Sequence, residues 1–77
     1  MYNVIYVFIY LNNLVGERLY KEQQEELINK ISLKVNGRIQ KSYSKLNEGL
    51  KMINLKYIII PKKSNSIRYW VIEKIEE

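Results

Sequence analysis

The first eleven residues most constrain the fold, because they form a nearly unbroken run of apolar and aromatic side chains. Valine, isoleucine, tyrosine and phenylalanine favour the pleated surface of a β-sheet, and a run that is apolar on both faces is typical of a central strand. The segment Asn3–Leu11 is therefore predicted to be a long buried strand. Alternate side chains of a strand share a face, so one face would be aromatic and carry Tyr2, Tyr6, Phe8 and Tyr10.

A helix is predicted over Leu14–Lys30, directly after this strand. Asn12 or Asn13 can cap its first turn, since asparagine accepts hydrogen bonds from the free backbone N–H groups there. The apolar positions of this segment are interrupted in the middle by Gln23 and Gln24. We therefore expect one of these two glutamines to be partly buried and hydrogen-bonded.

The next segment, Ile31–Tyr43, is predicted to be a β-hairpin because it contains Asn-Gly, a strong turn signal. A three-residue loop, Val35–Gly37, pairs Leu33 with Ile39 and separates the apolar side chains from the polar ones. A two-residue turn would place apolar and polar side chains on the same face of the hairpin, so the register with the three-residue loop is preferred.

The second half of the chain is predicted to contain a short helix and two strands. Ser44 can cap a helix over Ser44–Asn54, in which apolar residues recur at helical spacing. A buried strand, Leu55–Ile60, would stop at Pro61, because proline cannot donate a hydrogen bond to a sheet. A cationic loop follows, and the last strand is predicted at Ile67–Ile75.

These elements predict one α+β domain over residues 1–77 with the order β-α-β-β-α-β-β. That order is ferredoxin-like with one extra strand, and it places two helices on one face of a small antiparallel sheet. The alternative is a winged helix-turn-helix. In that case Ile39–Asn54 would hold the two helices, Lys56–Ile75 would be the β-wing with Lys62 and Lys63 at its tip, and the second helix would enter the major groove.

The composition argues against an enzyme, because the chain has no histidine, cysteine or aspartate. General acid–base catalysis at neutral pH would then need a strongly shifted carboxyl, amine or phenol. The glutamates of the first predicted helix are spread around its exposed side and paired with lysines, which indicates a solvated, salt-bridged surface rather than a metal site. No glycine-rich phosphate loop occurs. We therefore predict no catalytic residue, no metal and no cofactor.

The absence of cysteine removes any disulfide framework, and nothing suggests secretion. The N-terminal apolar run lacks a basic start and a cleavage site, and it is about half the length that a membrane-spanning helix needs. We therefore expect a cytoplasmic protein with no membrane association.

Two groups of residues are candidates for binding a partner. The net charge of +5 favours polyanions such as nucleic acid, although lysine codons of an AT-rich genome would also raise it. Exposed basic side chains are expected near the two predicted hairpin tips: Lys34, Arg38, Lys41, Lys62, Lys63 and Arg68. The aromatic face of the first strand is the second candidate, either as a platform on which bases stack or as a buried interface.

The function that these features favour is that of a small, non-enzymatic, nucleic-acid-binding or regulatory protein of an AT-rich microbe or mobile element. The alternative is a small viral or phage protein that docks on a host protein through its sheet face, in the cytoplasm of the host cell. In both cases a homodimer is expected, joined through the first-strand face or a sheet edge, because a core this small often gains stability by association.

Overall fold

The computed structural model describes residues 4–76 of the chain. It contains three helices and three strands within this range, which makes the chain a small α+β domain. In chain order they are α1 (Val4–Leu14), β1 (Arg18–Leu19), α2 (Lys21–Asn36), α3 (Tyr43–Met52), β2 (Tyr57–Ser64) and β3 (Ile67–Lys74).

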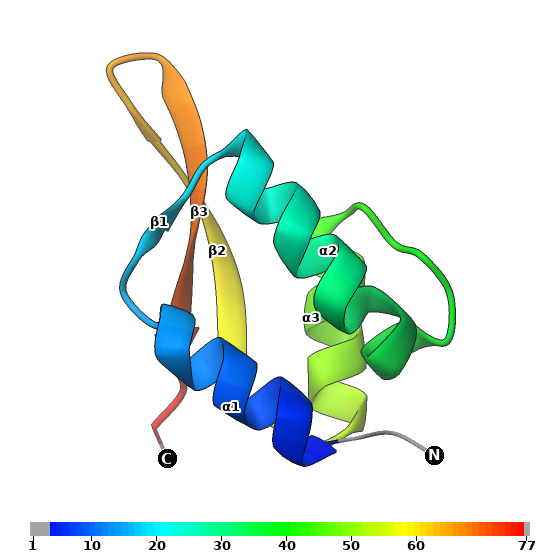
Figure 1. Cartoon of the computed structure of the whole chain (residues 1–77). Helices are drawn as coiled ribbons and strands as arrows, with labels where there is room; N and C mark the ends of the chain where they lie inside the picture. The colour runs from blue at the N-terminus through cyan, green and yellow to red at the C-terminus, as the bar shows by residue number, and fades with distance from the viewer. Residues whose placement is uncertain (1–3, 77) are drawn as a thin grey trace.

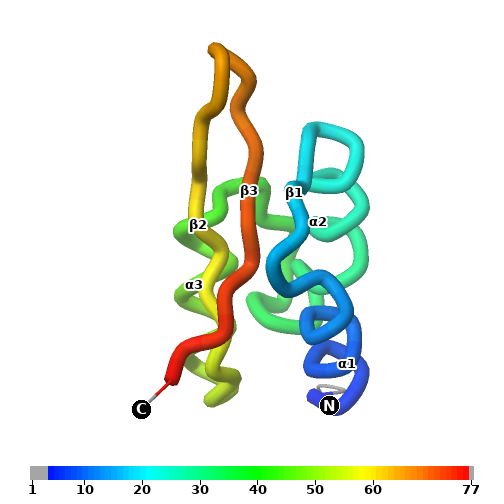
Figure 2. The backbone as a smooth tube through the Cα atoms, turned by 90° about the vertical axis from the view of Figure 1, so that its left-hand side faces the viewer, coloured from blue at the N-terminus to red at the C-terminus, as the bar shows by residue number. Residues whose placement is uncertain are grey.

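The three strands form one antiparallel sheet in the order β1-β3-β2. The hairpin of β2 and β3 extends well beyond the helices, and the helices lie on one side of the sheet (Figures 1 and 2). Its register runs from Tyr57 opposite Lys74 to Ser64 opposite Ile67. Asn65 and Ser66 form the tip, and both have positive φ angles, 51° and 69°, as a tight two-residue hairpin turn requires.

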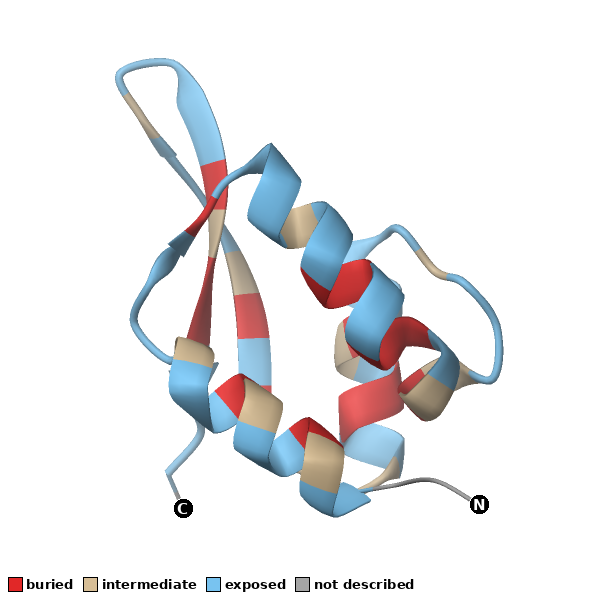
Figure 3. Cartoon of the chain, viewed as in Figure 1, coloured by how far each residue is buried: buried red, intermediate tan, exposed pale blue. Residues whose placement is uncertain are grey.

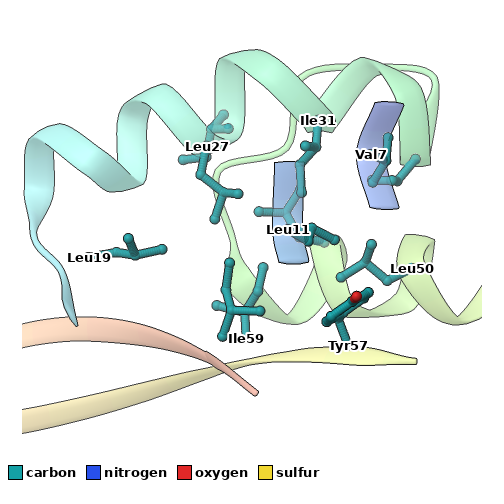
Figure 4. Close-up of a cluster of buried hydrophobic side chains, with 12 residues drawn as sticks. Val7, Leu11, Leu19, Leu27, Ile31, Leu50, Tyr57 and Ile59 are labelled. Carbon is teal, nitrogen blue, oxygen red and sulfur yellow. The ribbon is translucent and has the colours of Figure 1, made fainter. Parts of the chain in front are cut away.

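The hydrophobic core lies between the sheet and the helices, and every helix contributes to it (Figure 4). Burial of these aliphatic side chains is the main force that holds so small a domain together. The large side chains that are less than 3% exposed are Val7, Leu11, Leu19, Leu27, Ile31, Val35, Leu46, Leu50, Ile59 and Ile72.

The predicted first strand is wrong, because these residues form helix α1. Val7 and Leu11 are fully buried and are four residues apart, so they lie on one side of a helix. A short apolar run cannot be assigned to strand or helix by periodicity alone, because both of its faces are apolar. Tyr2 and Asn3 lie outside the described residues.

The predicted helix over Leu14–Lys30 is partly right. The segment after α1 turns at Gly16, which has a φ of +84°, and then forms the short strand β1. Helix α2 begins only at Lys21, where the backbone N–H of Tyr20 donates to Oε1 of Gln23 at 3.1 Å. The prediction of a half-buried glutamine is confirmed, since Nε2 of Gln24 donates to the Leu19 carbonyl at 2.9 Å.

The predicted hairpin around Asn36-Gly37 is wrong, because α2 continues through this region and ends there. Gly37 has a left-handed φ of 75°, and its N–H donates to the Leu33 carbonyl at 3.1 Å. An asparagine–glycine pair suits both a hairpin turn and the end of a helix, since each needs a residue with positive φ. The loop that follows is held by buried Ser32, whose Oγ donates to the Arg38 carbonyl at 3.0 Å.

The predictions for the second half of the chain are largely confirmed. Helix α3 and strand β3 lie within two residues of their predicted bounds. Strand β2 is longer than predicted, because it passes through Pro61 instead of ending there. β2 is an edge strand, and the backbone N–H of Ile59 points away from β3 toward α3. Backbone N–H groups alternate in direction along a strand, so the nitrogen of Pro61, two residues later, also points away from β3. Proline therefore costs the sheet no hydrogen bond at this position.

The ferredoxin-like order is not found in the described residues, where the order is helix, strand, helix, helix, strand, strand. The cause is the N-terminal run, which supplies a helix, and the Asn-Gly pair, which ends one. A pair of helices followed by a β-hairpin is what the alternative interpretation required. Its boundaries differ, because the first helix of the pair is α2 rather than a segment after Ile39.

Candidate nucleic-acid interface

Helix α3 is fixed against the free edge of the sheet by one side chain. Nδ2 of Asn47 donates to the Ile59 carbonyl at 2.9 Å, and the Ile59 N–H donates to Oδ1 of Asn47 at 2.8 Å. On the inner side of the helix, Leu46 and Leu50 are fully buried. The opposite side is exposed and mostly polar, and it carries Ser44, Lys45, Glu48, Lys51 and Met52.

The start of α3 is joined to the hairpin through aromatic rings. Tyr43, the first residue of α3, contacts Trp70 of β3 edge to face, with ring centroids 6.1 Å apart. Edge-to-face pairs stabilise an aromatic contact by about 0.5–1.5 kcal/mol beyond the burial of their area. The contact therefore holds the exposed side of α3 in a fixed position relative to the hairpin.

The outer half of the hairpin carries two cations directly opposite each other. Lys63 of β2 is the register partner of Arg68 of β3, so their side chains share a face of the sheet. Trp70 lies two residues after Arg68 and is on the same face. Both cations are exposed, and among the described residues neither is within ion-pair distance of a carboxylate. Like charges in this arrangement destabilise a hairpin, and a bound anion would remove that cost.

These residues surround a shallow hollow of about 360 Å³ between the start of α3 and the hairpin. Its wall combines aromatic rings with cationic groups. Such a wall suits a ligand that has a planar or apolar part and also carries negative charge. The residues that line it are Tyr43, Pro61, Lys62, Lys63, Arg68, Tyr69 and Trp70.

Lys62 differs from the other two cations of the hairpin. Its Nζ lies 3.8 Å from Oε2 of Glu73, and both side chains are about half exposed. On α3, Lys45 has a similar exposed contact with Glu48 at 3.6 Å. Exposed ion pairs of this kind contribute about 0–1 kcal/mol, so both lysines can exchange a carboxylate for a phosphate at little cost.

The structure brings together only half of the six predicted basic residues. Lys62, Lys63 and Arg68 line the hollow. Arg38 lies in the loop after α2 and Lys41 lies beside α2, where it borders a separate small hollow with Glu25. Lys34 is on α2, with its Nζ 4.9 Å from the centre of the Tyr6 ring.

The predicted aromatic face does not exist as one surface, because a helix distributes these residues over different sides. The rings of Tyr6 and Tyr10 are parallel, with centroids 6.2 Å apart, and they face lysines of α2. Phe8 points elsewhere and contacts Tyr57 of β2, with centroids 5.9 Å apart. Tyr6 and Tyr10 are thus part of the α1–α2 contact and do not form a platform for bases.

Two tyrosines that pack against the core, Tyr10 and Tyr57, have raised pKa values. Partial burial, then the charges of Glu26 and Tyr6, raise the pKa of Tyr10 to about 12. Burial also raises the pKa of Tyr57, whose hydroxyl donates to Oδ1 of Asn12 at 3.0 Å. Both phenols are therefore protonated at neutral pH and act as packing and hydrogen-bonding groups.

Tyr43, Trp70 and the exposed side of α3 were not among the predicted site residues. The helical spacing of Ser44, Lys45, Glu48 and Lys51 was visible in the sequence. Their relation to the hairpin was not, because it depends on the long-range contact between Tyr43 and Trp70. Sequence spacing carries no information on which of two distant segments meet.

Two further findings bear on the kind of site. Among residues 4–76, no three acidic or other metal-binding side chains come together in a group that could hold a metal ion. In the same range, no helix has both the length and the apolar character needed to cross a membrane.

Comparisons of the chain with protein-family models, with curated proteins and with solved structures found no match.

Proposed function

We propose that this chain is a winged-helix protein that binds double-stranded DNA. In this proposal α2 and α3 form the helix-turn-helix, α3 is the recognition helix, and the β2–β3 hairpin is the wing. The observation that carries it is the position of the Lys63–Arg68 pair, on the hairpin face that borders the start of α3. A recognition helix in the major groove would place such a wing beside the neighbouring phosphates.

The exposed side of α3 has side chains suited to reading bases. Lysine donates to the acceptors of guanine, and glutamate accepts from the amino group of cytosine. Lys45, Glu48 and Lys51 recur at the spacing of one helix face. Lys45 and Glu48 contact each other in the free protein, so DNA would separate them and give each a partner of its own.

The wing would supply affinity rather than sequence preference. Lys63 and Arg68 are cationic and exposed at the outer half of the hairpin, where they would neutralise phosphates and release counterions. The rings of Tyr43 and Trp70 form the apolar wall of the same hollow, against which a sugar of the DNA backbone can pack. A small regulatory protein of an AT-rich microbe or mobile element fits this combination.

The test is the binding of a fluorescent 20-base-pair duplex, followed by anisotropy over a range of salt concentrations. We expect affinity to fall steeply with salt, with a slope of about 0.9 for each phosphate contact. The double variant Lys63→Ala/Arg68→Ala should reduce that slope by roughly 2. Lys74→Ala is the matched control, because Lys74 is on the same strand and face as Arg68 but at the other end of the hairpin.

The same assay separates this proposal from its competitors. No binding at about 50 mM salt would overturn it and would favour the alternative in which the chain docks on a protein. Tighter binding to a single strand than to the duplex would contradict a recognition helix in the major groove. A loss in the Lys74→Ala control equal to half of the loss in the double variant would show that only net charge matters, because the control removes one charge and the double variant removes two.

Docking through the outer sheet face, the competing function, has weaker support. Around Tyr69 this face is already covered within the chain, since the ring of Tyr20 lies 5.7 Å away and the guanidinium of Arg18 lies 4.7 Å from the ring centre. The large apolar side chains of β2 and β3 that are exposed on this face, Ile58 and Ile67, are at opposite ends of the hairpin.

A further inference from the structure

Over residues 4–11 helix α1 is apolar or aromatic on all of its sides, although only one side faces the core, and Asn12 and Asn13 make its last turn polar. Val7 and Leu11 are fully buried, and the side that points away from the domain is exposed (Figure 3). A helix that is apolar all round is normally covered on all sides. The α1 outer face is defined here by four side chains with their exposed fractions: Val4 (36%), Ile5 (72%), Phe8 (42%) and Ile9 (54%). Phe8 is partly covered within the chain, because its ring also contacts Tyr57 of β2.

The pattern of this face matches a second copy of itself. Ile5, Phe8 and Ile9 are spaced by three and four residues, so they form a ridge along the helix. Two such ridges can pack antiparallel across a two-fold axis, with each residue of one copy meeting the same set of residues in the other. Phe8, in the middle of the ridge, would then lie near the axis.

The distribution of charge leaves α1 as the place where two copies can approach each other. The net charge of each chain is +5, so two copies repel each other over most of their surfaces. No charged residue occurs before Glu17, so α1 is an uncharged stretch through which two copies can approach. Two cations that do contact α1, Lys30 and Lys34, are on the α2 side and face the rings of Tyr10 and Tyr6.

The area of the α1 outer face sets the strength of such a contact. Side chains of this size present on the order of 150–200 Å² each when free, so the exposed fractions correspond to roughly 300–400 Å² of apolar surface per copy. Two copies would bury about 600–800 Å² in total, which is well below the standard size of a stable interface and allows only a weak, transient contact.

We propose that a second copy of this chain covers the α1 outer face and forms a weak, two-fold symmetric dimer through an antiparallel α1–α1 contact. The contact lies at the end of the molecule opposite the tip of the hairpin (Figures 1 and 2). It therefore leaves Lys63 and Arg68 uncovered in both copies, and it does not depend on what the hairpin binds.

The first test is sedimentation equilibrium of the full chain from about 1 to about 200 µM, a range that brackets a micromolar dissociation constant. We expect a monomer at the low end and a dimer at the high end. Ile9→Glu should raise the dissociation constant by at least about tenfold, because it places two carboxylates in the contact. Leu33→Glu is the matched control. Leu33 is 53% exposed, close to the 54% of Ile9, and lies on the solvent side of α2.

A cross-linking experiment tests the position of the axis without relying on a disruptive variant. The chain has no cysteine, so Phe8→Cys introduces the only thiol. Under mild oxidation we expect Phe8→Cys to form a covalent dimer much faster than Leu33→Cys at the same concentration. Circular dichroism of each variant establishes that it is folded.

Two results would overturn the proposal. One is a wild-type chain that stays monomeric over the whole concentration range. The other is a dimer that Leu33→Glu weakens as much as Ile9→Glu does. The outcome is separate from that of the DNA proposal, because a monomeric Ile9→Glu variant keeps the hairpin intact and should still bind a short duplex if that proposal holds.

Discussion

Asn47 is hydrogen-bonded twice to the backbone of Ile59, so its side-chain amide occupies the place that the peptide of a neighbouring strand would have. The edge strand β2 would otherwise present this N–H and carbonyl to α3 without a partner. One polar residue of α3 thus fixes the distance between the helix and the hairpin, which are the two parts of the proposed DNA interface.

Replacement of Asn47 by alanine should destabilise the domain. It removes both bonds and leaves two partly buried backbone groups unpaired, which costs about 1–3 kcal/mol. For a domain of this size the melting temperature should fall by about 4–8 °C per kcal/mol, as measured by thermal denaturation. Asn29→Ala on the exposed side of α2 is the control and should change the melting temperature little. Equal effects of the two substitutions would show that the Asn47 bonds contribute nothing.

Gly49→Ala should destabilise the domain even though alanine is the better helix former. A Cβ at this position would lie 2.8 Å from the carbonyl oxygen of Val35 and 2.8 Å from Oδ1 of Asn36. The expected cost of overpacking is about 1–3 kcal/mol, against a gain in helix propensity of about 1 kcal/mol. Chemical denaturation measures the net loss. Glu48→Ala, on the exposed side of the same helix, is the control, and a Gly49→Ala variant more stable than wild type would show that α2 and α3 can move apart.

Lys63→Glu should have opposite effects on stability and on DNA binding. It converts a pair of like charges across the hairpin into a pair of opposite charges with Arg68, which should stabilise the fold by about 0.2–1 kcal/mol. It should also weaken binding to duplex DNA by more than Lys63→Ala does, because it adds a charge that repels phosphate. Urea denaturation and anisotropy on the same sample measure the two effects. A loss of both stability and binding would show that the lysine has a packing role instead.

The pKa of Tyr10 predicts a loss of stability in alkali. The group is ordinarily ionised above pH 10, and in the folded chain its pKa is about 12, mainly because of burial. Between these values the unfolded chain releases a proton that the folded chain retains, so the contribution of Tyr10 is complete below pH 10 and is lost as the pH rises toward 12. The melting temperature of Tyr10→Phe should therefore fall less steeply than that of wild type between pH 10 and 12. If the melting temperatures of Tyr10→Phe and wild type fell in parallel over this pH range, the raised pKa of Tyr10 would be contradicted.

The elements that the sequence predicted well are those with a clear local pattern. The helix around Leu46 and Leu50 has apolar residues at helical spacing, and the last strand is bounded by a polar turn. The N-terminal helix could not be predicted, because a run that is apolar on every side has the same pattern as a buried strand. The Asn-Gly pair predicted a hairpin turn, but a glycine with positive φ such as Gly37 ends a helix as well as it turns a hairpin.

Only half of the candidate site could be predicted from the sequence, for a related reason. Lys63 and Arg68 are close together in the chain and in space because the hairpin pairs them, and Lys62 is the neighbour of Lys63 along β2. Tyr43 meets Trp70 across twenty-seven residues of sequence, and Asn47 meets Ile59 around the end of α3. These contacts depend on how the helices pack on the sheet, so no local pattern in the sequence predicts them.

The presence of Pro61 inside β2 has a consequence for the behaviour of the chain in concentrated solution. Strands as rich in isoleucine as β2 tend to recruit strands of other molecules through a free edge, which is the first step toward fibrils. Here the outer edge offers no N–H at Pro61, and its N–H and carbonyl at Ile59 are already bonded to Asn47. At Ile59 and Pro61 the edge of β2 therefore offers fewer free backbone groups to a strand of another molecule.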